Sequence, residues 1–256
     1  MSVSPGVNPA NGRVAVVTGA ASGIGLGVAQ RFAAGGLRVA LLDRHGEAAE
    51  AAAAALRSEG AVASAHQVDV ADRPSVAAAF DQVRASLGPV AVLVTSAGVD
   101  AFDPALDITA ETWDRVMAVN LTGTFVCIQA ALPDMIAAGW GRVVTISSSS
   151  AQSGPPRMAH YAASKAGVIG LTKSLAREFA RNGITVNCIP PSLVDTPMAR
   201  AAEARGMVDV DVAATRVPVG RAGTADDVAA ACAFLCSDEA SYVTGQLIGV
   251  NGGNYI

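Results

Sequence analysis

The sequence predicts a single α/β domain built on one doubly wound, mostly parallel sheet with helices on both faces. Short β-branched runs alternate with longer stretches that carry helical start and stop signals. Most of these runs are apolar throughout, as expected for parallel strands that are covered on both faces. No repeat, low-complexity linker or block of charge interrupts the alternation along the 256 residues, a length common for one α/β domain.

Each element is expected from its own local signals. Glycine follows the four clearest helical stretches, where it can adopt the left-handed conformation that often ends a helix. Asp72 and Thr224 start two further helices, because each can cap a helix that opens with a proline or with acidic residues. The expected strands are 14–18, 39–43, 62–68, 90–94, 143–147, 184–189 and 246–250, and the four helices are 24–34, 47–58, 111–138 and 159–182. Residues 1–12 are expected to be a flexible tail before one domain, 13–256.

Composition excludes several classes of function. The formal net charge is −4 and only 16% of residues are charged, so no nucleic-acid partner is expected. No uninterrupted apolar run is long enough to span a bilayer, and no signal peptide is evident. The four cysteines lie in apolar segments, as in buried thiols of a reducing cytoplasm. The three histidines have no metal-ligand spacing, so no metal is expected. Sparse polar surface predicts a homo-oligomer.

A glycine-rich turn follows the first strand and opens the first helix. In the run Thr18-Gly-Ala-Ala-Ser-Gly-Ile-Gly25, Gly19 permits a tight turn and Gly23 lets the backbone approach a pyrophosphate. Gly25 allows the helix to pack closely on the sheet, and free amides at the helix start can bind phosphates. Such a turn is typical of the Rossmann type of sheet, in which ligands bind beyond the carboxyl ends of the strands.

Asp43 closes the second strand, where a carboxylate can bind the ribose hydroxyls of an adenosine. The same carboxylate would repel a 2′-phosphate, and position 22 is serine rather than a basic residue. Arg44 is the one basic side chain nearby. We therefore expect NAD as the cofactor, with NADP as the alternative. Asp69 and Val70 end the third strand and are expected to hold the adenine amino group, although Asp69 could equally cap the next helix.

Tyr161 and Lys165 lie four residues apart at the start of a helix, so their side chains share one face. A phenol has an ordinary pKa near 10, and a cation beside it favours the phenolate and can lower that pKa. Lys165 is one of only two lysines in a chain with 16 arginines. A compact ammonium at this position is suited to binding a ribose.

With these motifs the sequence resembles the short-chain dehydrogenase/reductase family over about residues 13–253. The resemblance rests on the order of short motifs: TGAASGIG at 18–25, Asp69-Val70, Ser-Ala-Gly at 96–98, Val119-Asn120, Ile-Ser-Ser at 146–148, YAASK at 161–165, VNCIPPSLVDTPM at 186–198 and the terminal TGQLIGVNGG. It implies an oxidoreductase that interconverts a secondary alcohol and a ketone by hydride transfer.

The resemblance implies a catalytic tetrad. Ser148, thirteen residues before Tyr161, should stabilise charge on the substrate oxygen, and Tyr161 should act as general acid or base. Lys165 should hold the nicotinamide ribose and lower the pKa of Tyr161, while Asn120 should bind a water that relays protons. The residues implied to bind the cofactor are Gly19, Ser22, Gly23, Ile24, Gly25, Asp43, Asp69, Val70, Ala97, Gly98, Tyr161, Lys165, Pro191, Val194 and Thr196.

Two positions depart from the family pattern. Thr95-Ser96 replaces the first two asparagines of the usual Asn-Asn-Ala-Gly, the first of which helps to tie the central sheet together. Pro191-Ser192 replaces the usual Pro-Gly, so a side chain stands where the family keeps bare backbone beside the nicotinamide. We hypothesise that Ser192 narrows or polarises the substrate pocket.

The substrate class is left open by the sequence. Residues 198–218 are expected to form a mobile lid, and Phe102, Met158, Met198 and Met207 suggest an apolar binding face, or else lid and core packing. A small-molecule alcohol or ketone of modest polarity is the first expectation.

Three alternative functions fit parts of the sequence. A 3-oxoacyl thioester reductase is the main one, although arginines that would meet an acidic carrier are replaced by Gly139 and Asn182, with Arg142 and Arg181 close by. A non-catalytic NAD-binding regulator would not need the tetrad, and a methyltransferase would not need Tyr161 and Lys165. The family resemblance further implies a homotetramer in which helices 111–138 and 159–182 pair across a two-fold axis.

Overall fold

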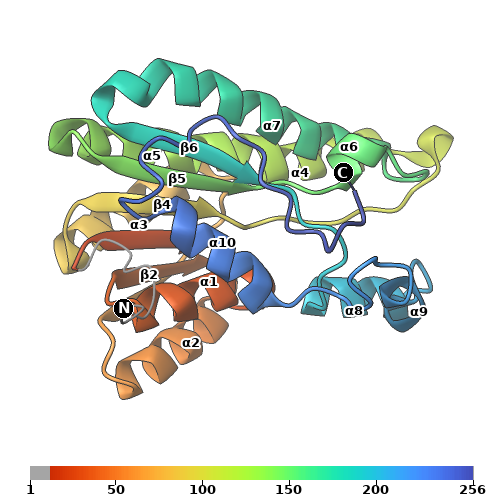
Figure 1. Ribbon diagram of the computed structural model, residues 1–256, viewed down its shortest axis with the longest axis horizontal. Coiled ribbons are helices and arrows are strands. Elements are labelled where there is room, and N and C mark those ends of the chain that lie inside the picture. Colours follow the sequence, from red (N-terminus) through yellow and green to blue (C-terminus); the bar gives the residue numbers. More distant parts are fainter. Residues whose placement is uncertain (1–11, 256) are drawn as a thin grey trace, which may run out of the picture.

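The computed structural model describes residues 12–255, so the expected tail lies outside the described residues except for Gly12. Six parallel strands form one sheet in the order β3-β2-β1-β4-β5-β6 (Figure 1). The chain runs outward from β1 to β3, crosses back to β4 and continues to β6, so the winding reverses between β1 and β4. The strands are β1 Val14–Thr18, β2 Arg38–Asp43, β3 Ala63–Gln67, β4 Val90–Thr95, β5 Gly141–Ile146 and β6 Ile184–Ile189.

Helices cover both faces of the sheet and bury a separate apolar core on each (Figure 1). Val16 of β1 points into one core with Phe80, and Val17 points into the other with Phe32, as the two-residue period of a strand requires. One face is covered by α1 Gly23–Ala34, α2 Gly46–Ser58 and α10 Ala225–Leu235, and the other by α3 Arg73–Leu87, α5 Gly123–Ala138 and α7 Ala159–Phe179. The doubly wound α/β class is confirmed.

The expected start signals act as caps. The Asp72 carboxylate accepts a hydrogen bond from the Ser75 amide at 3.1 Å, and Thr224 forms a reciprocal capping box with Asp227 at the start of α10. Asp69 does not cap α3; its side chain accepts from the amide of Ala71 instead. The remaining helices are α4 Ala110–Met117, α6 Ser150–Ser153, α8 Pro197–Ala204 and α9 Val210–Ala214, with 3₁₀ turns Ala105–Asp107 and Ala180–Asn182.

Two expected elements differ from the structure. The expected strand 246–250 is reduced to one bridge, in which Leu247 pairs with Cys188 beside β6. The expected helix 111–138 is interrupted by a π-helical turn, Ala118–Thr122, between α4 and α5. The stretch Ala110–Ala138 is long and apolar enough to cross a membrane by composition, but half of its most apolar window is buried inside the fold. That burial is typical of the core helix of a globular domain.

The four cysteines are buried and free, as expected. Burial raises the pKa of the Cys127 and Cys236 thiols to about 12, so both are protonated at neutral pH.

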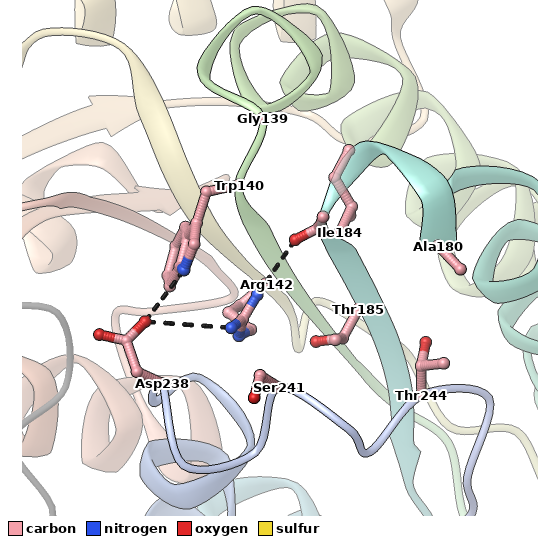
Figure 2. A pocket seen from close by; sticks show the side chains of 10 residues that line it. Gly139, Trp140, Arg142, Ala180, Ile184, Thr185, Asp238, Ser241 and Thr244 are labelled. Atoms are coloured by element: carbon pink, nitrogen blue, oxygen red, sulfur yellow. Dashed lines mark hydrogen bonds and ion pairs between the residues drawn. The ribbon is translucent and has the colours of Figure 1, made fainter.

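Arg142 ties the amino-terminal edge of β5 and β6 to the segment after α10 (Figure 2). The residue is 2% exposed, and its guanidinium donates hydrogen bonds to the backbone oxygens of Ser237, Gly141 and Gly183 at 3.1, 2.8 and 3.3 Å. The guanidinium also lies 4.3 Å from the ring centre of Trp140. Arg142 lines a cavity of about 390 Å³ at this edge of the sheet. The bonded carbonyls indicate a structural role for the buried charge.

We expect Arg142→Leu to lower the free energy of unfolding by about 2–3 kcal/mol, because three carbonyls lose a charged donor. Arg13→Leu is the matched control, since Arg13 covers the same Trp140 ring from a more exposed position, and it should cost less than about 1 kcal/mol. Urea unfolding followed by circular dichroism measures both. Equal losses in the two variants would contradict the structural role of Arg142.

Candidate active site

The sequence-predicted site residues gather where the strands end. Because all six strands are parallel, their carboxyl ends share one edge of the sheet, and the loops that leave this edge lie together. The structure places the predicted residues as follows: the glycine loop after β1, Asp43 at the end of β2, Asp69 and Val70 after β3, Ala97 and Gly98 after β4, Ser148 after β5, and Pro191, Val194 and Thr196 after β6.

The glycine loop is closely packed against its neighbours. Gly19 has φ +66°, and a Cβ there would lie 2.8 Å from the Cα of Ala97. A Cβ on Gly25 would collide with the carbonyl oxygen of Gly19. Ser22 precedes α1 but its side chain does not cap the helix, so the first amides of α1 have no side-chain cap within the described residues. This uncapped, positively polarised helix start fits a pyrophosphate.

Asp43 is 9% exposed and is held by the backbone around it. One carboxylate oxygen accepts from the amide of Ala21 at 3.0 Å, and the other accepts from the amide of His45 at 2.9 Å. The carboxylate therefore stands beside the glycine loop, where an adenosine ribose would lie. Arg44 is exposed. The position of Asp43 fits the predicted ribose contact. Its negative charge lies where the 2′-phosphate of NADP would bind.

Thr18 joins the ends of the two central strands. Its hydroxyl accepts from the amides of Ser96 and Ala97 at 3.2 and 3.1 Å. Thr95, which replaces the family asparagine, does not take over its link, because its buried hydroxyl has no hydrogen-bond partner within the described residues. Thr18 therefore makes the link at this point, and Thr95 lies against it in the sheet register.

Asn120 lies in the π-helical turn and is fully buried. Its side-chain oxygen accepts from the amide of Val99 at 2.9 Å, and its amide nitrogen donates to the oxygen of Val99 and to the Ser164 hydroxyl. Both amide hydrogens are thus used, so the water implied by the resemblance would have to donate to an oxygen of Asn120 that already accepts a hydrogen bond, from Val99 at the side chain or from Thr124 at the backbone. The side chain fixes the loop after β4 to the helix that carries Tyr161.

Lys165 is 5% exposed, and its ammonium donates to the backbone oxygen of Ile146 at 2.9 Å. Burial lowers the pKa of Lys165 to about 8, because the charged form loses its hydration. A Cβ on Gly98 would lie 3.4 Å from the Lys165 ammonium and 3.3 Å from the side-chain oxygen of Asn120. Gly98 therefore keeps open the space between these two groups.

Tyr161 lies on the same helix face as Lys165, whose ammonium is 5.9 Å from the ring centre. Burial raises the pKa of Tyr161, a hydrogen bond with Ser148 lowers it, and the charge of Asp100 raises it further. The net direction is upward, which differs from the lowering that we expected from Lys165. Desolvation outweighs the hydrogen bond with Ser148, and the charge of Asp100 acts in the same direction as desolvation.

Ser148 has one acceptor position in use. Its oxygen accepts from the amide of Ser150 at 3.1 Å, which leaves the hydroxyl proton to donate. The next residue along the chain, Ser149, donates its amide to the oxygen of Pro191 at 2.8 Å and so fixes the loop after β5 to the loop after β6.

The loop after β6 carries the other predicted contacts. Val194 pairs with Gly223 in an isolated bridge, and the Thr196 hydroxyl accepts from the amide of Ala199 and caps α8. The Cβ position of Gly23 is 3.5 Å from the Thr196 side chain, so this loop meets the glycine loop. The lid residues Met198 and Met207 are exposed, whereas Met158 is buried.

Two side-chain pairs at the site were not predicted from the sequence. His160 is fully buried, with one ring nitrogen 3.1 Å from the Asp103 carboxylate and the other accepting from the amide of Tyr161. Asp100 forms an ion pair at 2.6 Å with Arg205 at the end of α8. For the His160–Asp103 pair, the one available indication in the sequence was that His160 directly precedes Tyr161. No local sequence pattern indicates the Asp100–Arg205 pair.

These features fit a nicotinamide dinucleotide. An uncapped helix start and a buried carboxylate suit its diphosphate and adenosine ribose. The opening kept by Gly98 between Asn120 and Lys165 suits its second ribose. A phenol and a hydroxyl that share a hydrogen bond can together hold an alcohol or carbonyl oxygen and exchange its proton.

Comparisons with known proteins agree with this chemistry. A family model described as enoyl-(acyl carrier protein) reductase matches residues 19–254. D-Threitol dehydrogenase of Mycolicibacterium smegmatis is 40% identical over 95% of this chain and 93% of its own length. The 3-oxoacyl-(acyl-carrier-protein) reductase FabG of Staphylococcus aureus is 40% identical over 94% and 98%. The crystal structure of a single-residue variant of actinorhodin polyketide ketoreductase with NADPH has a TM-score of 0.91, at 38% identity over 94% and 97% of the two chains.

We expect Lys165→Met to be more stable than the wild type below pH 8, by up to roughly 3 kcal/mol, because the wild type buries an ammonium whose pKa falls from 10.5 to about 8 on folding. The unfolded chain binds more protons than the folded chain between these values. The wild type should therefore recover the difference as the pH rises from 8 to 10.5.

Urea unfolding at pH 7 and at pH 10 measures this difference. Lys173→Met removes the other, exposed lysine of the same helix and should give no pH-dependent difference. A Lys165→Met protein whose stability relative to wild type is the same at both pH values would contradict the burial cost.

Proposed function

Because the chain belongs to the short-chain dehydrogenase/reductase family and is an oxidoreductase of that family, we propose that it interconverts a secondary alcohol and a ketone, with Tyr161 as general acid and base. The observation that carries this proposal is the meeting of Ser148, Tyr161, Lys165 and Asn120 at one edge of the sheet. A bound nicotinamide cofactor supplies the hydride acceptor or donor.

Each of the four site residues has its own role in the rest of the reaction. Ser148 donates its hydroxyl proton to the substrate oxygen and stabilises the charge that develops there. Tyr161 takes the alcohol proton during oxidation and returns it during reduction. Lys165 binds the ribose, and its ammonium, 5.9 Å from the ring centre of Tyr161, favours the phenolate form. Asn120 positions the helix of Tyr161, and a second lone pair on one of its oxygens accepts from the relay water.

NAD is the preferred cofactor in this proposal. The Asp43 carboxylate, fixed by two backbone amides, accepts from ribose hydroxyls and repels a 2′-phosphate. The solved relative that binds NADPH keeps NADP as the alternative.

A 3-oxoacyl thioester reductase is the second candidate, since the matching family model and one close relative carry acyl-carrier names. The arginine nearest the expected carrier surface argues against it. Arg142 is buried under Trp140 and bonded to backbone oxygens, so it is not available to an acidic carrier, while Arg181 is exposed.

We further propose a cytoplasmic homotetramer. Several large apolar side chains stay exposed on the helices, and a partner surface would cover them. These are Trp113 of α4, Ile136 of α5 and Phe234 of α10, each about 40% exposed. α10, which carries Phe234, covers the opposite face of the sheet from α5, which carries Ile136, and this suits two separate interfaces.

Tyr161→Phe tests the general acid and base. We expect it to lower kcat for alcohol oxidation by about 10²–10⁴-fold, because the proton acceptor is lost while the ring stays in place. Nicotinamide absorbance with a panel of secondary alcohols, hydroxysteroids and 3-hydroxyacyl thioesters measures the rate. Tyr242→Phe is the matched control, as Tyr242 is fully exposed. Equal activity in wild type and Tyr161→Phe would contradict the assignment.

Asp43→Asn tests the cofactor preference. Removing the negative charge should raise the ratio of kcat/KM with NADP to kcat/KM with NAD by at least about tenfold, which corresponds to about 1.4 kcal/mol. Asp72→Asn is the control. It removes the same charge at the start of α3, where asparagine caps a helix as well as aspartate does, and it should leave the ratio unchanged. A wild type that prefers NADP would show that Arg44 outweighs Asp43.

A further inference from the structure

The last described residues fold back over the active-site edge of the domain. The oxygen of Gly252 accepts at 3.1 Å from the amide of Val219, the residue that follows the expected lid. The side chain of Asn251 accepts from the amide of Gly253 and donates to the oxygen of Tyr255, so the segment Asn251–Tyr255 forms a turn of its own. Figure 1 shows this chain end beside α6, the short helix after Ser148.

Two side chains of the segment bond to the loops that form the site. The Asn254 amide donates to the Ser192 hydroxyl at 2.7 Å, and the Tyr255 hydroxyl donates to the oxygen of Gln152 in α6 at 3.2 Å. Ser192 follows Pro191, whose oxygen is bonded to the amide after Ser148. The segment therefore joins the lid, the loop after β6 and the loop after β5.

The pair Ser192–Asn254 has unused polar atoms. Ser192 accepts one hydrogen bond and keeps its own proton, and the side-chain oxygen of Asn254 makes no hydrogen bond within residues 12–255. Both side chains are at least partly exposed. The hydrogen bond between the Asn254 side-chain nitrogen and the Ser192 hydroxyl, 2.7 Å long, holds the two side chains next to each other. A substrate hydroxyl group can then accept from the Ser192 hydroxyl and donate to the side-chain oxygen of Asn254.

Building on the proposed function, we propose that Ser192 and Asn254 form a polar subsite that binds a second hydroxyl group of the substrate, beyond the reacting carbon. The chain then favours diols and hydroxy ketones over simple alcohols and ketones. The Ser192 hydroxyl, which replaces the bare backbone of the family pattern, is one half of this subsite, and the end of the chain supplies the other half.

Three alcohols with one carbon skeleton test the subsite: pentan-2-ol, pentane-2,3-diol and pentane-2,4-diol. For the wild type we expect kcat/KM to be about tenfold higher with at least one diol than with pentan-2-ol, as one well-placed hydrogen bond allows. Ser192→Gly and Asn254→Ala should each remove this preference, mainly by raising KM for the diol. Oxidation of pentan-2-ol should change less than about threefold.

Two further variants separate binding from structural damage. Ser192→Thr keeps the hydroxyl and should keep the diol preference. Ser241→Gly makes the same change as Ser192→Gly at an exposed position on the opposite edge of the sheet and should have no effect (Figure 2).

The subsite is overturned if the variants slow all three alcohols by the same factor, or if the diol preference survives both changes. In either case the proposed function stands, because the wild type still oxidises the alcohols. A wild type that oxidises none of the three overturns the proposed function together with the subsite.

Discussion

The buried side chain of Asn120 is the contact on which the active site depends. Its oxygen and nitrogen bond to both backbone groups of Val99 in the loop after β4, and its nitrogen also reaches Ser164 in α7. An unpaired amide in this position would cost about 1–3 kcal/mol, so the arrangement is strongly preferred. Ser164 in turn donates to the oxygen of Tyr161. One amide therefore fixes the loop after β4 to the helix of Tyr161 and Lys165.

Desolvation then sets the chemistry of that helix. The protein interior disfavours both the Lys165 ammonium and the Tyr161 phenolate, so the pKa of the lysine falls and that of the tyrosine rises. In water the two pKa values differ little and the lysine has the higher one, whereas inside the protein they move apart and the tyrosine has the higher one. Ser148 opposes the rise at Tyr161, whereas Asp100 adds to it. For Tyr161 to act as a base near neutral pH, positive charge must lie close to its phenol and lower its pKa.

Much of this architecture is predictable from local sequence. Six of the seven expected strands exist, and the spacing of Tyr161 and Lys165 alone places both on one helix face. The π-helical turn at Asn120 is not predictable, because α5 after it is apolar at most positions, so the shift in the apolar pattern by one residue leaves no visible break. Residues 246–250 resemble a strand, yet only Leu247 pairs with β6. The Asp100–Arg205 and Ser192–Asn254 contacts join residues 105 and 62 positions apart, which no local pattern reports.

Transfer of a hydride from the substrate carbon, with Tyr161 handling only the proton, is the central claim about this site. A secondary alcohol deuterated at its carbinol carbon tests it most directly, with the reduced cofactor isolated and analysed by mass spectrometry and NMR. We expect one deuterium at C4 of the nicotinamide, on a single face, with none released to water. Deuterium that appears in the solvent, or a cofactor without label after turnover, would contradict direct hydride transfer.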